Sequence, residues 1–142
     1  MKYFSKKHDI ERQTKGSAGI DLPAYLKNSV KVQPGEDIKI DTGIHVEIPE
    51  GFYGLVLPRS SFGIKKTMIL KNTAGVIDSD YRGPIKLFLR NYGNDTVEIN
   101  DGERIAQLII CPFEAVTTSR VESLDDLTIT SRGSGGFGST GK

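Results

Sequence analysis

The sequence predicts an all-β protein of antiparallel strands, arranged as a sandwich or barrel with jelly-roll or Greek-key crossings. Apolar and polar residues alternate with a period of two over many short stretches, and turn residues separate these stretches at intervals of about eight to twelve residues. The 3.6-residue apolar period of a long helix is absent. A length of 142 residues fits one compact domain and leaves little room for a second.

Turn signals separate the strand candidates in the first half of the chain. Residues 1–16 mix charges without a strong period, so we expect an edge strand or a loose lead-in there. Small residues begin the next candidate, and three later candidates alternate. A further candidate is mainly apolar, and we expect it to be a buried strand that ends at Pro58. The candidates are 17–22, 30–33, 38–42, 44–48 and 52–57.

The stretch 75–83 is the feature around which the other motifs are arranged. Apolar β-formers run into an Asp-Ser-Asp turn, and a Gly-Pro pair ends the excursion before a strand resumes over 85–91. This pattern predicts a β-hairpin whose tip carries the carboxylate of Asp78, the phenol of Tyr81 and the guanidinium of Arg82. The alternative is an ordinary solvated turn, in which aspartate is common for backbone reasons alone.

Shorter elements surround this stretch. We expect one helical turn and a short strand before it, two strands after it, and then a polar, weakly helical stretch and a glycine-rich tail. These elements are 61–66, 68–70, 96–99, 105–111, 122–126 and 131–142.

The composition argues against several kinds of partner and location. With 19 basic and 18 acidic residues the net charge is +1, which gives no electrostatic case for a nucleic-acid partner. One cysteine excludes an intramolecular disulfide. No apolar run reaches membrane-spanning length, and the N-terminus lacks the apolar core of a signal peptide. We therefore expect a cytoplasmic chain without a membrane partner, in the host cytoplasm if a virus encodes it.

Three polar features stand out among the strands. Arg59, Ser60 and Ser61 follow an apolar strand and precede a helical turn, which suits an anion site; the alternative is that Ser60 merely caps the helix. Gln107 lies in an otherwise apolar strand and is expected, taken alone, to face outward. Asp21, taken alone, reads as a turn or cap residue.

The tail combines glycines with a few residues that can bind a nucleotide. Its glycines disfavour a strand or helix because they lose much backbone entropy on ordering. Arg132 is suited to pairing with a phosphate, and Phe137 to stacking on a base. Ser139 and Thr140 add hydroxyl groups. A plain flexible linker is the alternative, but a linker needs neither the arginine nor the phenylalanine.

Taken together and in order, five segments resemble the five motifs of the trimeric dUTP diphosphatase (dUTPase) family. The third and fifth are long and specific, and the resemblance covers nearly the whole chain. Ser61-Phe62 departs from the pattern, since many members have glycine after the Arg-Ser pair. The five segments are 18–22, 58–61, 75–83, 103–108 and 132–140.

The resemblance implies a homotrimer of jelly-roll subunits of the β-clip type, with three active sites at subunit interfaces. It divides the chain into a barrel domain over residues 1–130 and a flexible arm over residues 131–142 that closes over the active site. The implied reaction is the Mg²⁺-dependent hydrolysis of dUTP to dUMP and pyrophosphate. This reaction limits uracil incorporation into DNA and supplies dUMP for dTMP synthesis.

The resemblance also implies a role for each matched residue. Asp78 would deprotonate a water that attacks the α-phosphorus, and Asp21 would hold waters bound to a Mg²⁺ ion that the phosphates carry. The phosphates would meet Arg59, Ser60, Ser61 and Gln107, with Arg132, Gly138, Ser139 and Thr140 closing over them. Tyr81 would pack under the deoxyribose and Phe137 on the uracil. The edge of the uracil would be read by Asn72, Gly75 and Ile77.

Two other functions remain open on the sequence. A dCTP deaminase shares the fold and nucleotide class in family terms, but needs a proton-transferring group such as a glutamate near C4 of the base. A catalytically silent trimer that binds nucleotide or a protein partner is the second alternative. The presence of Asp78, Arg59, Gln107 and the arm favours the diphosphatase over both.

Overall fold

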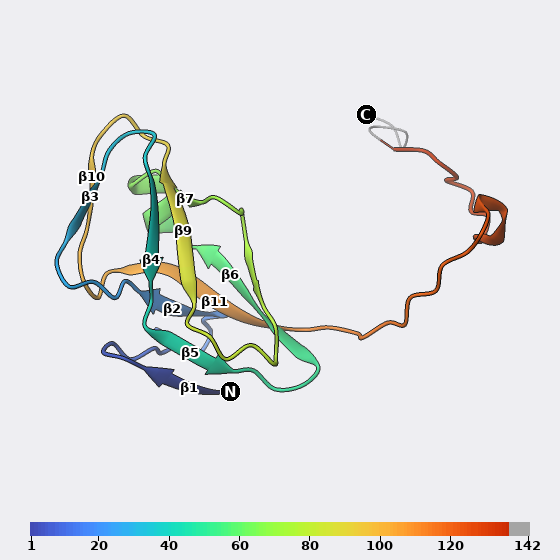
Figure 1. Ribbon diagram of the computed structural model, residues 1–142, viewed down its shortest axis with the longest axis horizontal. Helices are drawn as coiled ribbons and strands as arrows, with labels where there is room; N and C mark the ends of the chain where they lie inside the picture. Colours follow the sequence, from blue (N-terminus) through green and yellow to red (C-terminus); the bar gives the residue numbers. More distant parts are fainter. Residues whose placement is uncertain (137–142) are drawn as a thin grey trace.

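The computed structural model describes residues 1–136, which form short antiparallel strands stacked in layers (Figure 1). Its largest sheet has four strands, and β6 and β11 lie at its centre. In spatial order the strands are β2 (Gly19–Pro23), β11 (Arg104–Pro112), β6 (Phe52–Pro58) and β8 (Gly75–Ile77).

A second sheet and two strand pairs complete the body of the molecule. Every pairing is antiparallel, as the sequence predicts for a jelly roll. The second sheet contains β4 (Asp37–Asp41), β9 (Lys86–Asn91) and β7 (Met68–Leu70), in that order. The pairs are β1 (Lys2–Ser5) with β5 (Ile44–Glu47), and β3 (Val30–Val32) with β10 (Val97–Ile99).

The core lies between the layers and follows the period-two pattern of the sequence. On β9, Leu87 and Leu89 are buried while Lys86 and Phe88 are exposed. The same alternation buries aliphatic side chains from both sheets in one continuous cluster. The all-β, jelly-roll prediction is therefore confirmed.

The predicted hairpin over 75–91 is wrong in its pairing. β8 pairs with β6, whereas β9 pairs with β4 and β7 in the other sheet. The cause lies at Ile85, whose N–H donates to Ile44 O at 2.8 Å and whose carbonyl accepts from Thr42 N–H at 3.1 Å. These bonds direct the chain onto the second layer before β9 begins. Residues 78–84 are thus a crossover loop between sheets.

Three other expectations can be compared with the structure. β6 is only half-buried, because Gly54 and Val56 face the core and its other residues do not. The helical turn near residues 61–66 exists, as the π-helical η1 (Ser61–Lys65), but the Ser60 side chain makes no capping hydrogen bond. The stretch at 122–126 contains the 3-10 turn η2 (Leu124–Asp126). Within residues 1–136, no helix has the length and apolar character needed to cross a membrane.

The chain leaves the body after β11 and runs away from the strands (Figure 1). Within residues 114–136 the side chains are almost all exposed. The hydrogen bonds of this segment are local, for example Arg132 Nε–H to Gly135 O at 2.9 Å. The division into a domain over 1–130 and an arm over 131–142 stays a prediction.

Asp101 ties the N-terminal segment to the turn before β11. Its carboxylate accepts from the N–H of Leu26 at 2.9 Å and lies 3.0 Å from His8 Nε2 and 2.5 Å from Lys7 Nζ. The hydrogen bonds from Lys7 and then Leu26, with the His8 ring close by, hold the pKa of Asp101 well below its usual range. The turn that leads into β11 is therefore held from two sides.

Candidate active site

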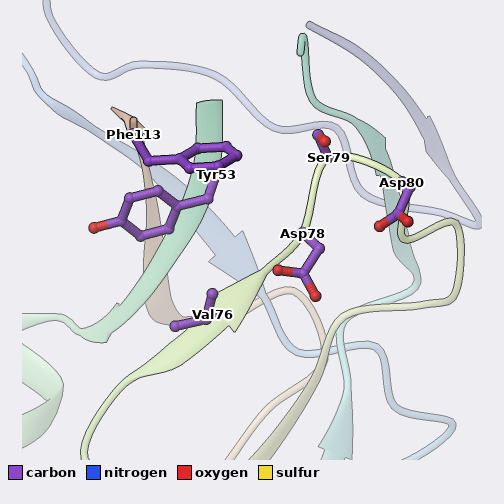
Figure 2. A pocket seen from close by; sticks show the side chains of 6 residues that line it. All are labelled: Tyr53, Val76, Asp78, Ser79, Asp80 and Phe113. Atoms are coloured by element: carbon purple, nitrogen blue, oxygen red, sulfur yellow. The ribbon is translucent and has the colours of Figure 1, made fainter. Parts of the chain in front are cut away.

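Asp78 lies at the mouth of a surface pocket, directly after the end of β8 (Figure 2). The pairing of Ile77 with Gly54 of β6 positions the backbone just before it. The Asp78 side chain is exposed, so its carboxylate is open to solvent. The pocket has a volume of about 640 Å³ and is lined by Tyr53, Val76, Asp78, Ser79, Asp80 and Phe113.

One side of this pocket is aromatic and the other is acidic (Figure 2). The rings of Tyr53 and Phe113 meet edge to face, with centroids 6.3 Å apart. Electrostatic interaction with Cys111, the cross-strand partner of Tyr53, raises the pKa of the Tyr53 hydroxyl above its ordinary value. The phenol therefore stays neutral near pH 7, and the charges at this pocket come from the acidic side. Sequence reasoning missed Tyr53 and Phe113, which no motif contains.

The loop that carries Asp78 is tightly folded on itself. Tyr81 N–H donates to Asp78 O at 3.2 Å, and Arg82 Nη1 donates to Ser79 O at 2.6 Å. The Tyr81 hydroxyl donates to Pro84 O at 3.0 Å, which turns its ring back over Gly83. A Cβ at Gly83 would lie 2.3 Å from the Tyr81 oxygen, so glycine is required there for this ring position. The predicted turn chemistry thus exists without the predicted hairpin.

The residues predicted to read a base lead up to Asp78 along the chain. Asn72 is exposed in the turn between β7 and β8, where Thr73 adopts a positive φ of 59°. Gly75 lies opposite Val56, and a Cβ there would lie 3.3 Å from the Val56 Cβ. Ile77 is half-buried at the end of β8.

A second cluster lies at the other end of the same sheet. Asp21 of β2 is bound by Arg59 Nε at 2.8 Å and by Arg104 Nη1 at 3.2 Å. Asp21 and Gln107 are cross-strand partners, and the Gln107 amide donates to Pro58 O at 3.2 Å. Segments 18–22, 58–61 and 103–108 therefore meet here. The interpretation of Asp21 as a turn or cap residue is wrong, because Asp21 lies within β2. Gln107 is half-buried and hydrogen-bonded, so its description as merely outward-facing is incomplete.

A β-bulge brings Arg104 into this cluster. The pairing of β11 with β2 shifts by one residue between Arg104 and Ala106, so Ile105 has no partner and both Ile105 and Ala106 are buried. Without the extra residue, Arg104 would share the inward face with Ala106. The bulge turns it outward to Asp21. Sequence reasoning missed Arg104 as a site residue, because the period of two hides a bulge.

The cluster opens on a cationic surface pocket beside η1. Its volume is about 400 Å³, and its charges come from Arg59, Arg104 and two lysines, with Glu103 as the one acidic group. Glu103 is already paired with Lys66, whose Nζ lies 2.5 Å from it. Ser60 is exposed beside it, and Ser61 lines this pocket. An excess of positive charge beside hydroxyl groups is suited to binding a phosphate-bearing anion.

Within one chain, the two clusters are far apart. The pairing of β8 with β6 sets Asp78 level with Tyr53, whereas Arg59 lies just past the opposite end of β6. Six residues of strand at about 3.3 Å each separate them by about 20 Å. The structure thus brings Asp21, Arg59 and Gln107 together, and it leaves Asp78 and Tyr81 elsewhere.

The remaining predicted residues lie in the tail. Arg132 is exposed within the segment beyond β11, and within residues 1–136 the one hydrogen bond of its side chain goes from Nε to Gly135 O. Phe137, Gly138, Ser139 and Thr140 lie outside the described residues. Residues 1–136 contain no group of three or more His, Cys, Asp or Glu side chains placed to hold a metal ion.

The protein is therefore a jelly roll that carries two separate polar sites on one sheet. An open pocket with a carboxylate lies at one end of this sheet, and an arginine-rich anion site lies at the other. The family model for dUTPase matches residues 5–141. The chain belongs to the dUTPase family.

Comparisons with individual proteins support the same family assignment. A deoxyuridine 5'-triphosphate nucleotidohydrolase of Escherichia phage T5 is 46% identical over 130 residues, covering 88% of this chain and 86% of that protein. A mutant dUTPase of Staphylococcus bacteriophage 80alpha, solved with dUpNHpp, superposes with a TM-score of 0.84 at 28% identity over 99% of this chain and 98% of that one. A mutant dUTPase of phage phi11 of S. aureus coordinates a structural Mg(II) ion; it has a TM-score of 0.76 and 25% identity, over 87% of this chain and 97% of that one.

Proposed function

We propose that this protein hydrolyses dUTP to dUMP and pyrophosphate. The observation that carries the proposal is the family membership together with an open aspartate, Asp78, at the end of β8 in a segment that resembles the third family motif. The relative from phage 80alpha was solved with dUpNHpp, whose name places an NH bridge between the first and second phosphates. That bridge occupies the position of the bond that the proposed reaction breaks.

Asp78 acts as the general base in this proposal. Its carboxylate takes a proton from a water molecule, and the water oxygen attacks the α-phosphorus in line with the departing pyrophosphate. Exposure of Asp78 lets the water reach it, while the paired strand before it fixes its backbone. Arg59, Ser60, Ser61 and Gln107 bind the phosphates and offset their charge.

The donor set fits a Mg²⁺ ion carried by the phosphates and not by the protein alone. Asp21 is already held by Arg59 and Arg104, and residues 1–136 contain no group of three or more His, Cys, Asp or Glu side chains placed to hold a metal ion. Asp21 would therefore reach such an ion only through its water shell. When bound, the ion would neutralise phosphate charge and favour the reactive conformer of the triphosphate.

Base selection rests on the segment before Asp78. Asn72 and the backbone at Gly75 and Ile77 read the edge of uracil, since a cytosine amino group would set donor against donor and leave buried groups unpaired. Tyr81 packs under the deoxyribose and leaves no room for a 2′-hydroxyl. Phe137 stacks on the base.

The active site is completed between subunits of a homotrimer. A single chain holds Asp78 and Arg59 about 20 Å apart along β6, too far for both to act at the α-phosphate of one nucleotide. Between them the outer face of the sheet is apolar and half-exposed at Leu55, Leu57 and Ile109. A neighbouring copy covering this face would bring its own polar cluster to Asp78, and three-fold symmetry repeats the contact.

Mixed oligomers test this arrangement. Asp78→Asn and Arg59→Ala chains should each be inactive alone, and co-expression should restore activity, because the first supplies Arg59 and the second Asp78 to a shared site. Random mixing leaves about a quarter of the sites intact. Pyrophosphate release is measured on the purified mixed oligomer and on each parent. Mixed oligomers as inactive as both parents would show that one chain supplies both residues.

The arm closes the site in this proposal. Arg132, Ser139 and Thr140 hold the terminal phosphate, with Gly138 allowing close backbone approach, and closure excludes water other than the nucleophile. The described part of this segment makes no hydrogen bond to the strands, so it is free to reach another subunit.

The direct test is pyrophosphate release from dUTP, dCTP, dTTP and UTP, each with and without Mg²⁺. We expect rapid, Mg²⁺-stimulated release from dUTP alone. Ammonia release from dCTP would identify a deaminase instead. Binding of dUTP without release from any nucleotide would identify a silent binding protein.

A further inference from the structure

We infer that His45 is a positioning residue for the loop that carries Asp78 and Tyr81. This inference rests on the proposed function, because it assigns the loop a catalytic task. His45 lies at the centre of β5 and outside all five matched segments.

The contact that carries the inference joins His45 to the far side of the loop. Its Nδ1 lies 2.9 Å from Arg82 O. A carbonyl oxygen only accepts, so Nδ1 carries the hydrogen and donates it. Within residues 1–136 this is the only side-chain hydrogen bond that reaches residues 78–84 from outside them.

Arg82 passes this restraint on to the rest of the loop. Its guanidinium donates to the carbonyls of Ser79 at 2.6 Å and Tyr81 at 3.0 Å. Tyr81 N–H in turn donates to Asp78 O. The hydrogen bond from His45 holds the backbone of Arg82 in place. It therefore also positions the Arg82 guanidinium, which binds the carbonyls of Ser79 and Tyr81 next to Asp78.

His45 itself is held firmly. Ile44 and Val46 on either side of it are buried, which fixes β5 against the core. Phe4 of β1 is its cross-strand partner, and the two rings meet edge to face with centroids 5.7 Å apart. The half-buried imidazole is therefore a rigid donor, whereas the loop it holds is exposed at Asp78, Tyr81 and Arg82.

Two variants separate the hydrogen bond from the packing. His45→Phe keeps a ring against Phe4 and removes the donor. His45→Asn removes the ring, but its amide nitrogen replaces Nδ1 at the same distance from the backbone. His45→Gln, whose amide lies one carbon further out, serves as the matched control for His45→Asn.

We expect kcat for dUTP to fall about tenfold in His45→Phe and in His45→Gln, with KM nearly unchanged, because a loosened loop misplaces the base without removing a phosphate contact. His45→Asn should recover wild-type kcat to within about threefold. Equal kcat in wild type and His45→Phe, or equal losses in His45→Asn and His45→Gln, would overturn the inference.

Amide hydrogen exchange tests the same point without any activity. Exchange over residues 79–83 should be about tenfold faster in His45→Phe than in wild type, and close to wild type in His45→Asn. Melting temperatures and oligomer size, measured alongside, show that the variants are folded. A wild-type protein that fails to hydrolyse dUTP overturns the proposed function, whereas unchanged exchange in His45→Phe overturns the role of His45.

Discussion

Asp78→Asn is expected to bind dUTP with nearly wild-type affinity and to lose turnover by about 10³-fold, which is about 4 kcal/mol of transition-state stabilisation. Asparagine has the size of aspartate but cannot take a proton from water. Because Asp78 is exposed and no hydrogen bond of its side chain is present in the described part of the chain, the exchange should not disturb the fold. Single-turnover pyrophosphate release and equilibrium binding of dUTP measure the two effects separately.

Asp80→Asn is the matched control for this prediction. Asp80 lines the same pocket and carries the same charge, but it lies two residues further into the loop (Figure 2). If the loss of negative charge at the pocket were the main cause, turnover would fall equally in Asp78→Asn and Asp80→Asn. We expect Asp80→Asn to keep turnover within about tenfold of wild type. Undiminished turnover in Asp78→Asn would remove Asp78 from the role of base.

Removal of residues 132–142 should cut turnover by about 10²-fold while the protein stays folded and trimeric. The loss is expected because, in the proposed function, the arm closes over the site, which would exclude water and add contacts to the terminal phosphate. The fold should survive, since residues 114–136 are almost wholly exposed and bond only to one another in the described part of the chain. Pyrophosphate release, melting temperature and light scattering are the three measurements.

Arg132→Ala in the full-length chain is the control for the truncation. It removes the one phosphate contact proposed for Arg132 and keeps the rest of the arm, so its loss of turnover should be smaller than that of the truncation. If the truncated protein instead falls to monomers, the arm is a structural element of the oligomer. The account of the arm as a closing lid would then be wrong.

The period-two pattern was sufficient for the fold class and most of the strands. Alternation on β4, β5 and β9 follows burial directly, because successive side chains of a strand point to opposite faces. The same rule failed at two places. A bulge at Ile105 turns Arg104 to the outer face, and β8 is too short for its pattern to specify a partner strand.

The candidate site residues could likewise be predicted only in part: the sequence indicated which residues to consider, but not where they lie. The resemblance of five ordered segments to the dUTPase motifs singled out Asp78, Arg59 and Gln107, although each residue taken alone also suited an ordinary structural position; their roles stay predictions. The sequence of a segment does not determine which sheet the strand after a loop joins.

Only the tertiary structure decided where these residues lie. It places Asp21 between two arginines, sets Asp78 at the opposite end of the same sheet from Arg59, and gives His45 a hydrogen bond to a loop 37 residues further along the chain. Each of these contacts joins segments that are distant in sequence. Such contacts depend on how the layers pack and on strand register, which the pattern within any single segment does not specify.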